Sequence, residues 1–370
     1  MILDWLARSG AHAMAEYTQK IALLFCALAL VTANCNAQSA SRSPVVSNSR
    51  QALLSALSWL PADTETLLVA NGPFSMPPIS GDDDDEKRDR VVSQKELRAQ
   101  FQALPISLFG LNSHLLQSRM VGREITIALE GSRHFRTPRA LGEMPYEGCD
   151  IVVFARDITE LRETFMKESA DSVSTREVID GQLVTVFQNK MEEDVWTFFV
   201  AFPKPNVVAI ATNRDYLSEV LARIGGAFGP RALPDDLPEW RYVNLRASCW
   251  GLRHYDKSQS ESDPSSPFAG EESASLIADD QAIGIVFNFE PGPYRAANIV
   301  YLSGDKAILP EVKQRFFPSE ADPESTKDLH VQFRQLSPGV VQSSYMLAHS
   351  ESVFFFLFVL MAAVGHGVYL

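Results

Sequence analysis

The chain has 370 residues, of which 46% are hydrophobic, and a formal net charge of −13 at pH 7. This length and composition suffice for one large folded unit or two ordinary ones, each with a hydrophobic core. The acidic balance excludes a protein that holds nucleic acid or anionic lipid by bulk electrostatics, so no nucleic-acid partner is expected.

An apolar run near the N-terminus predicts a signal peptide. Ile21–Thr32 follows Lys20 and precedes several small residues. The run is shorter than the ~20 residues of a comfortable membrane span, and this order of charge, apolar run and small residues is typical of secretory signals. We predict a signal peptide over residues 1–37, cleaved after Ala37, with an uncleaved anchor as the alternative. A flexible Ser-rich stem over 38–48 follows it.

Residues 49–228 are predicted to form a first lobe of helices and hairpins. Apolar spacing and capping residues indicate helices over Ser49–Leu60, Gln94–Leu104, Asp157–Glu168 and Asn213–Ile224. Alternating or continuous apolar runs indicate strands over Thr66–Ala70, Arg123–Leu129, Asp150–Ala155, Glu177–Asp180, Gln182–Phe187, Val195–Phe202 and Val207–Thr212. Asp180-Gly181 is a strong hairpin signal, so the sheet is predicted to be largely antiparallel.

A Pro-rich segment over 229–239 is predicted to open a second lobe, which spans 229–350. Its expected strands are Tyr242–Ala247, Ile283–Phe289, Arg295–Leu302, His330–Leu336 and Val340–Met346, and its expected helix is Ile308–Phe316. This order repeats the helices and hairpins of the first lobe. The predicted fold class is therefore α+β, with two lobes of mainly antiparallel sheet covered by helices.

A second apolar run predicts a C-terminal transmembrane helix over 352–370. Val353–Leu370 contains no Lys, Arg, Asp or Glu and is rich in phenylalanine. A helix that is apolar on every face suits lipid, and this one is just long enough to span a bilayer. The alternative is a buried C-terminal core helix. Together with the signal peptide, the helix predicts an exported protein anchored to a membrane, with its soluble part outside the cytoplasm.

Two cysteines remain after the predicted cleavage, Cys149 and Cys249. In an oxidising compartment they would form one disulfide that closes a long loop. The alternative is a pair of buried free thiols that pack as small apolar residues. Spacing alone does not decide between the two.

The stretch Arg246–Asp256 gathers most of the residues that suit chemistry. His254 and Asp256 are candidates for a catalytic base and the acid that orients it. Arg246 and Arg253 are candidates for contacting an anion or a partner. The alternative is structural, with Trp250, Leu252 and Tyr255 in a core and Arg253 paired with Asp256.

Familiar signatures of catalysis and cofactor binding are missing from the sequence, including GxSxG, HExxH, GxGxxG, the Walker loop and CxxC. The histidines and cysteines show no metal-ligand spacing, and the acidic run Asp82–Glu86 lacks the spaced ligands and the glycine of a calcium loop. No cofactor and no metal are therefore predicted.

The segments Leu60–Ala70 and Trp250–Asp256 resemble parts of uncharacterised bacterial exported proteins. The resemblance implies export and a repeated α+β architecture, and it carries no active-site residue. The predicted function is a binding or structural module of a cell envelope, with an unknown small-molecule ligand or a protein partner, and the missing motifs do not exclude an enzyme. The alternatives are a tethered hydrolase with its site near His254 and Asp256, and an accessory subunit of a membrane complex.

Overall fold

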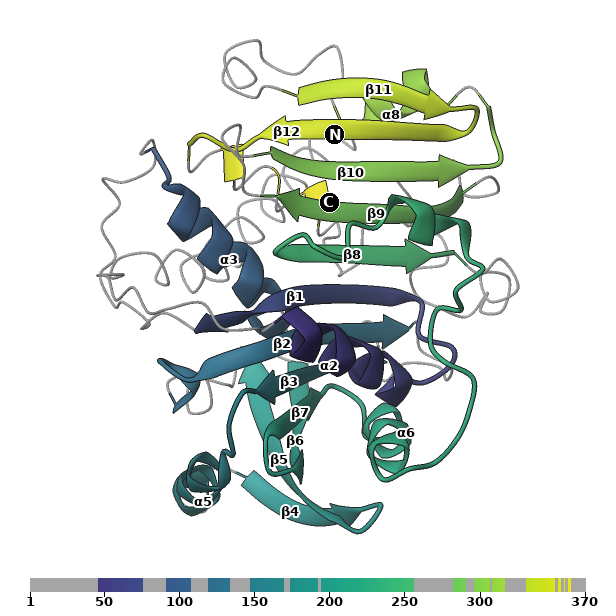
Figure 1. The fold of residues 1–370 in the computed structure, drawn as a ribbon. Coiled ribbons are helices and arrows are strands. Elements are labelled where there is room, and N and C mark those ends of the chain that lie inside the picture. The colour runs from purple at the N-terminus through teal and green to yellow at the C-terminus, as the bar shows by residue number, and fades with distance from the viewer. Residues whose placement is uncertain are drawn as a thin grey trace, which may run out of the picture.

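The computed structural model describes residues 46–75, 91–107, 119–133, 147–169, 174–191, 194–255, 282–290, 296–306, 308–316, 331–349, 352, 353, 356, 359 and 360. Figure 1 shows the described strands side by side in one continuous sheet. The sheet is 12-stranded and antiparallel, with the order β11-β12-β10-β9-β8-β1-β2-β3-β7-β6-β5-β4.

The strands are β1 (Thr66–Ser75), β2 (Glu124–Arg133), β3 (Glu147–Phe154), β4 (Ser174–Ile179), β5 (Gln182–Met191), β6 (Asp194–Lys204), β7 (Val207–Ala211), β8 (Cys249–His254), β9 (Ala282–Glu290), β10 (Ala296–Ser303), β11 (Val331–Ser337) and β12 (Val340–Met346). The described helices are α2 (Val46–Trp59), α3 (Gln94–Ser107), α5 (Thr159–Glu168), α6 (Arg214–Ile224) and α8 (Leu309–Phe316), with a 3-10 turn, η5 (Pro238–Tyr242).

The pairing of β1 with β8 corrects the predicted fold class. These strands lie side by side at the centre of the sheet, with Leu67 opposite Leu252 and Val69 opposite Trp250. The hydrogen-bond ladder therefore runs unbroken across the expected boundary between the lobes. The described residues form mostly sheet, so the prediction of an α+β protein with two helix-covered lobes is wrong.

The two halves of this sheet share an order of elements. In the first half, β1, β2 and β3 pair in sequence, α5 follows, and β7 returns to pair with β3. In the second half, β8, β9 and β10 pair in sequence, α8 follows, and β12 returns to pair with β10. The halves therefore meet through their corresponding first strands, β1 and β8.

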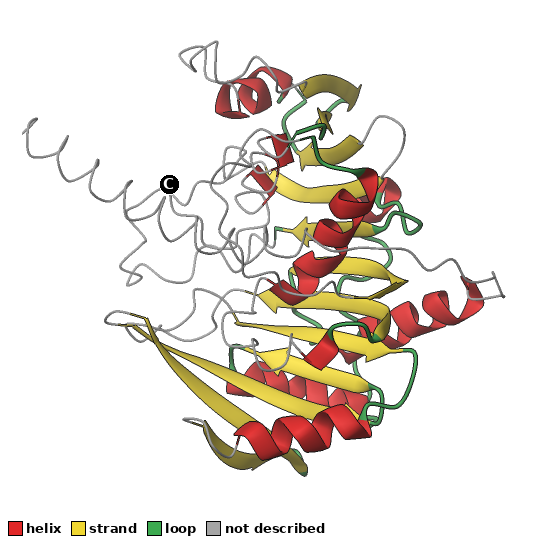
Figure 2. Ribbon diagram, turned by 90° about the vertical axis from the view of Figure 1, so that its left-hand side faces the viewer, coloured by secondary structure: helices red, strands yellow, loops and turns green. Residues whose placement is uncertain are grey.

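Side chains alternate between the two faces of each strand and divide the core in two. Leu67 and Val69 of β1 pack in one cluster with residues of α2 and α6, and we call this side the α2 face. Leu68 packs with residues of α3, and Ala70 packs with residues of α5. We call this second side the α3 face. Figure 2 turns the molecule so that helices are visible on both sides of the sheet.

Most predicted elements are present, with shifted ends. β1 extends five residues beyond Ala70, α2 begins at Val46 rather than Ser49, and α3 continues through Pro105. The hairpin at Asp180-Gly181 is confirmed, and both residues have the positive φ angles, 48° and 73°, of a type I′ turn.

The predicted strand Tyr242–Ala247 is wrong. Its backbone is bonded by a side chain instead of a neighbouring strand, since Asn288 Oδ1 accepts from the N–H of Asn244 and Asn288 Nδ2 donates to the carbonyl of Tyr242. Apolar residues here pack as a cover on the α2 face, which explains the misleading pattern.

The described residues of the C-terminal apolar segment are buried in the core, which corrects the prediction of a transmembrane helix. Val353, Phe356, Val359 and Leu360 are buried on the α3 face. The Phe356 ring lies 5.7 Å from that of Phe101, and it also contacts the rings of Phe287 and Tyr345. A side chain buried against the sheet is not exposed to lipid, and the alternative of a buried helix fits these residues.

Among the described residues, no helix is long and apolar enough to cross a bilayer. The predicted signal peptide, most of the predicted stem and residues 361–370 lie outside the described part of the chain.

We predict that Phe356→Ala lowers the free energy of unfolding by about 3–5 kcal/mol, because it removes a fully buried ring from an aromatic cluster. Denaturant unfolding measures the effect. Phe228→Ala is the matched control, since Phe228 is fully exposed and its loss should change stability by no more than about 0.5 kcal/mol. Equal effects of the two substitutions would contradict the placement of Phe356 in the core.

Candidate functional site

Four neighbouring central strands, β8, β1, β2 and β3, carry a row of charged side chains on the α2 face, close to one end of each strand. Arg133 of β2 stands opposite Glu147 of β3. Glu65 immediately precedes β1, where its N–H donates to the carbonyl of Ser132 and its own carbonyl accepts from the N–H of His254. Side chains in register on neighbouring strands share a face, so His254, Glu65, Arg133 and Glu147 form one line. We call this line the polar row.

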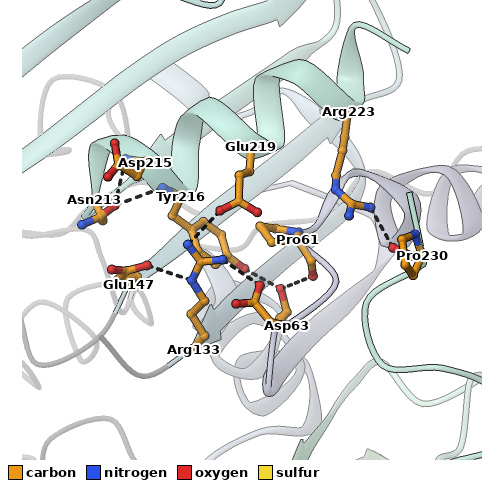
Figure 3. A network of polar contacts seen from close by, with 11 residues as sticks. Pro61, Asp63, Arg133, Glu147, Asn213, Asp215, Tyr216, Glu219, Arg223 and Pro230 are labelled. Atoms are coloured by element: carbon orange, nitrogen blue, oxygen red, sulfur yellow. Dashed lines mark hydrogen bonds and ion pairs between the residues drawn. The ribbon is translucent and has the colours of Figure 1, made fainter. Parts of the chain in front are cut away.

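Arg133 is the best-bonded member of the polar row (Figure 3). Its guanidinium donates to Asp63 at 2.7 Å, to Glu147 at 2.8 Å and to Glu219 at 3.0 Å, and its side chain is only 2% exposed. Burial alone would lower the pKa of Arg133, but the three carboxylates outweigh it and raise that pKa. The network therefore ties the turn before β1, the ends of β2 and β3, and helix α6 to one buried charge.

Helix α6 is fixed so that it reaches this network. Asn213 caps its first turn, with its side-chain oxygen accepting from the N–H groups of Asp215 at 2.9 Å and Tyr216 at 3.0 Å. The ring of Tyr216 lies 4.9 Å from the Arg133 guanidinium, and its hydroxyl is 2.8 Å from that of Thr64. Glu219 follows Tyr216 by one helical turn and completes the set of acids around Arg133.

The other end of the polar row holds a histidine and a buried acid. His254 Nδ1 lies 2.8 Å from Oε1 of Glu239, a residue of η5 with 0% side-chain exposure, whereas the His254 side chain is 31% exposed. A carboxylate only accepts hydrogen bonds, so the Nδ1–H tautomer of His254 is the one that can donate to a carboxylate at this position. Oε2 of Glu239 has no hydrogen-bond partner among the described residues.

Gly284 of β9 makes room for this carboxylate. A Cβ atom at that position would lie 2.0 Å from Oε1 of Glu239 and 2.6 Å from the backbone oxygen of Arg253. Only a glycine at position 284 therefore leaves space for the Glu239 carboxylate against β9, next to His254. This close approach explains the glycine better than any turn does, because Gly284 lies inside a strand.

The row and its immediate partners are strongly acidic. In the part of the chain that the structure describes, the row and its immediate partners comprise five carboxylates, those of Asp63, Glu65, Glu147, Glu219 and Glu239, with one arginine and one histidine. Three of these acids share Arg133, so acidic groups outnumber basic groups among the described residues of the row. Such a site favours cations over anions.

The structure separates most of the residues predicted to act together. His254 pairs with Glu239, and its predicted partner Asp256 lies outside the described residues. Arg253 is on the α3 face, with its guanidinium 4.6 Å from the ring centre of Tyr255. Arg246 is exposed in the segment before β8. The anion-binding candidates are therefore not gathered around His254.

Sequence reasoning missed Glu239 and Arg133. Glu239 lies in a Pro-rich segment that carries no motif, and it reaches His254 only because η5 packs over β8 and β9. Arg133 lies at the end of β2, where the alternation of the strand places it on the buried face. A charged residue at such a position was the one sign in the sequence that it has a buried partner.

Cys149 and Cys249 are buried free thiols, without a disulfide between them. Cys149 packs in the cluster of the α2 face and Cys249 in the cluster of the α3 face, so the sheet itself separates them. Burial raises the pKa of both thiols.

Among the described residues, no three or more His, Cys, Asp or Glu side chains are arranged to hold a metal ion. Comparisons of the chain with protein-family models, curated proteins and solved structures find no match. The geometry of the polar row is therefore the basis for a functional proposal.

We predict that Arg133→Met lowers the free energy of unfolding by about 3–5 kcal/mol, because it leaves the buried Glu147 without its counter-charge. Urea unfolding at neutral pH measures the loss. The matched control is Arg214→Met, which removes a more exposed ion pair with Glu177 and should cost about 0–1 kcal/mol. A cost for Arg133→Met as small as that of its control would refute the structural weight given to the network.

We predict that Gly284→Ala breaks the contact between His254 and Glu239, because the added methyl group occupies the place of the Glu239 carboxylate. The expected result is loss of the Nδ1 proton resonance of His254 in ¹⁵N-edited NMR, with a stability loss of about 1–3 kcal/mol. Glu239→Gln keeps the side-chain shape and serves as the comparison. An unchanged His254 resonance in the Gly284→Ala protein would show that the contact does not depend on this glycine.

Proposed function

We propose that this chain is an exported binding protein of a cell envelope whose ligand carries a cationic group, and that this group docks at the His254 end of the polar row. The observation that supports it is the charge imbalance of the row, in which five carboxylates face one arginine and one histidine. The net charge of −13 acts in the same direction over longer distances.

Glu239 indicates which kind of cation suits the site. Its carboxylate is fully buried, and Oε2 has no hydrogen-bond partner among the described residues. A buried carboxylate oxygen is costly unless a donor reaches it. An ammonium or guanidinium group supplies both the donor and the compensating charge. The partly exposed His254 marks the place where the row meets solvent and where such a group enters.

We predict saturable binding of agmatine, which carries one guanidinium and one ammonium group. Trp240 is the reporter, because it neighbours Glu239 and its ring lies 5.9 Å from that of Trp250. Glu239→Gln should weaken binding at least about tenfold, or about 1.4 kcal/mol. Glu177→Gln, at the more exposed pair with Arg214, should leave the affinity unchanged.

Succinate is the anionic control in the same titration, and it should produce no saturable change in tryptophan fluorescence. The proposal fails if agmatine produces none either, or if the substitutions at Glu239 and Glu177 have the same effect.

The contact between His254 and Glu239 favours a hydrolase as the second candidate. A buried carboxylate that accepts from Nδ1 is the arrangement that orients a general base. His254 would take a proton from water as the water attacks an ester carbonyl carbon, and would return it to the leaving alcohol. Loss of p-nitrophenyl acetate turnover in His254→Gln would support this candidate. It ranks second because the nearby thiol, Cys249, lies on the α3 face.

A further inference from the structure

Two carboxylic acids lie next to each other at the centre of the sheet, away from the polar row. Asp150 of β3 stands directly opposite Glu130 of β2. Their exposed fractions are 0% and 1%. Both belong to the alternate positions of their strands that face α3 and α5, so the pair lies on the α3 face. Directly opposite side chains on antiparallel strands lie within contact distance.

Asp150 lacks any stabilising partner among the described residues, since neither of its carboxylate oxygens has a hydrogen-bond partner there. An isolated buried carboxylate is so costly that such a group normally becomes neutral by taking up a proton. The neighbouring acid adds to the cost, because two adjacent negative charges repel each other in a poorly solvated environment.

We propose that Asp150 holds a proton at neutral pH, which makes the β2–β3 pair a pH-sensitive element at the centre of the sheet. A proton on Asp150 removes its buried charge and, with it, the repulsion between the two acids. The proposal is independent of the ligand assigned to the polar row.

Among the charged groups around Asp150, Glu130 is the one that acts on its pKa. Burial, followed by the charge of Glu130, raises the pKa of Asp150 well above its usual range. Glu130 also acts on Cys249 of β8, which adds to the effect of burial and raises the pKa of that thiol. Arg253 also lies on the α3 face of β8, where its guanidinium is 4.6 Å from the ring centre of Tyr255.

Gln102 of α3 donates to the backbone oxygen of Asn71 in β1, and the other buried side chains that α3 and α5 turn towards the α3 face include apolar ones. From α3 these are Leu97 and Phe101, and from α5 they are Leu161 and Phe165. The charged residues of the two helices are exposed or partly exposed, namely Lys95, Glu96, Arg98, Glu160, Arg162, Glu163, Lys167 and Glu168. Cys149 adjoins Asp150 in the chain but lies on the α2 face, and its pKa is raised by burial.

The direction of the pH effect follows from these pKa shifts. The folded chain binds a proton at Asp150 in the range above the ordinary pKa of 3.8, where the unfolded chain has lost it. The contribution of Asp150 to the free energy of unfolding is therefore fully present below pH 3.8, and it is lost as the pH rises towards the raised pKa of the folded state. Each pH unit in this window reduces the folding equilibrium constant by up to tenfold, or about 1.4 kcal/mol.

The test measures unfolding by urea from about pH 5 to pH 8 for the chain and for Asp150→Asn. Asp150→Asn should have the larger free energy of unfolding near pH 8, and this free energy should no longer fall as the pH rises. Asp157→Asn is the matched control, because Asp157 is exposed and its pKa is lowered by hydrogen bonds from Thr159. The control should keep the slope. Equal slopes for the chain and Asp150→Asn would overturn the proposal.

Infrared spectroscopy detects the proton directly. The spectrum of the unsubstituted chain decides the test even if a variant fails to fold. At neutral pH the chain should show the carbonyl stretch of a protonated carboxylic acid, and Asp150→Asn should lack it. Glu130→Gln should shift the titration of that band to lower pH, since it removes the neighbouring charge. Absence of the band from the chain at neutral pH would overturn the proposal.

Discussion

The pairing of β1 with β8 is the contact on which the rest of the structure depends. It joins two halves with the same order of elements into one sheet, and it places Glu65 beside His254. Without this ladder, the acids around Arg133 and the pair of His254 with Glu239 would belong to separate surfaces. The polar row therefore depends on a contact between strands that lie far apart in the sequence.

The centre of the sheet carries ionisable groups on both faces, at an unusual density for a core. On the α2 face, opposite charges satisfy one another around Arg133, and each carboxylate there has a guanidinium within hydrogen-bond distance. On the α3 face, Asp150 and Glu130 are two acids that stand opposite each other on the same two strands. One strand pair thus combines an ion network that holds it together with an acid pair that loosens it when ionised.

Local patterns were sufficient for most strands and turns but not for their arrangement. The alternation of Ile285, Phe287 and Phe289 and the cap at Asn213 follow from neighbouring residues, and both are present. The two-lobe prediction failed because no local pattern specifies that β1 pairs with β8. Glu239 was missed for the same reason, since it meets His254 only through packing of η5. The C-terminal run misled because an aromatic-rich segment has the same composition in a core as in a membrane.

The burial of Phe356 against Phe101 has a consequence for how the chain acquires its structure. These rings are separated by about 250 residues, a distance in sequence that makes loop closure slow. The aromatic cluster of the α3 face cannot assemble until both segments have been synthesised. Until then the apolar side chains of β9 and β10 on the α3 face lack the cover that Phe356 provides, and exposed apolar surface of this kind favours aggregation.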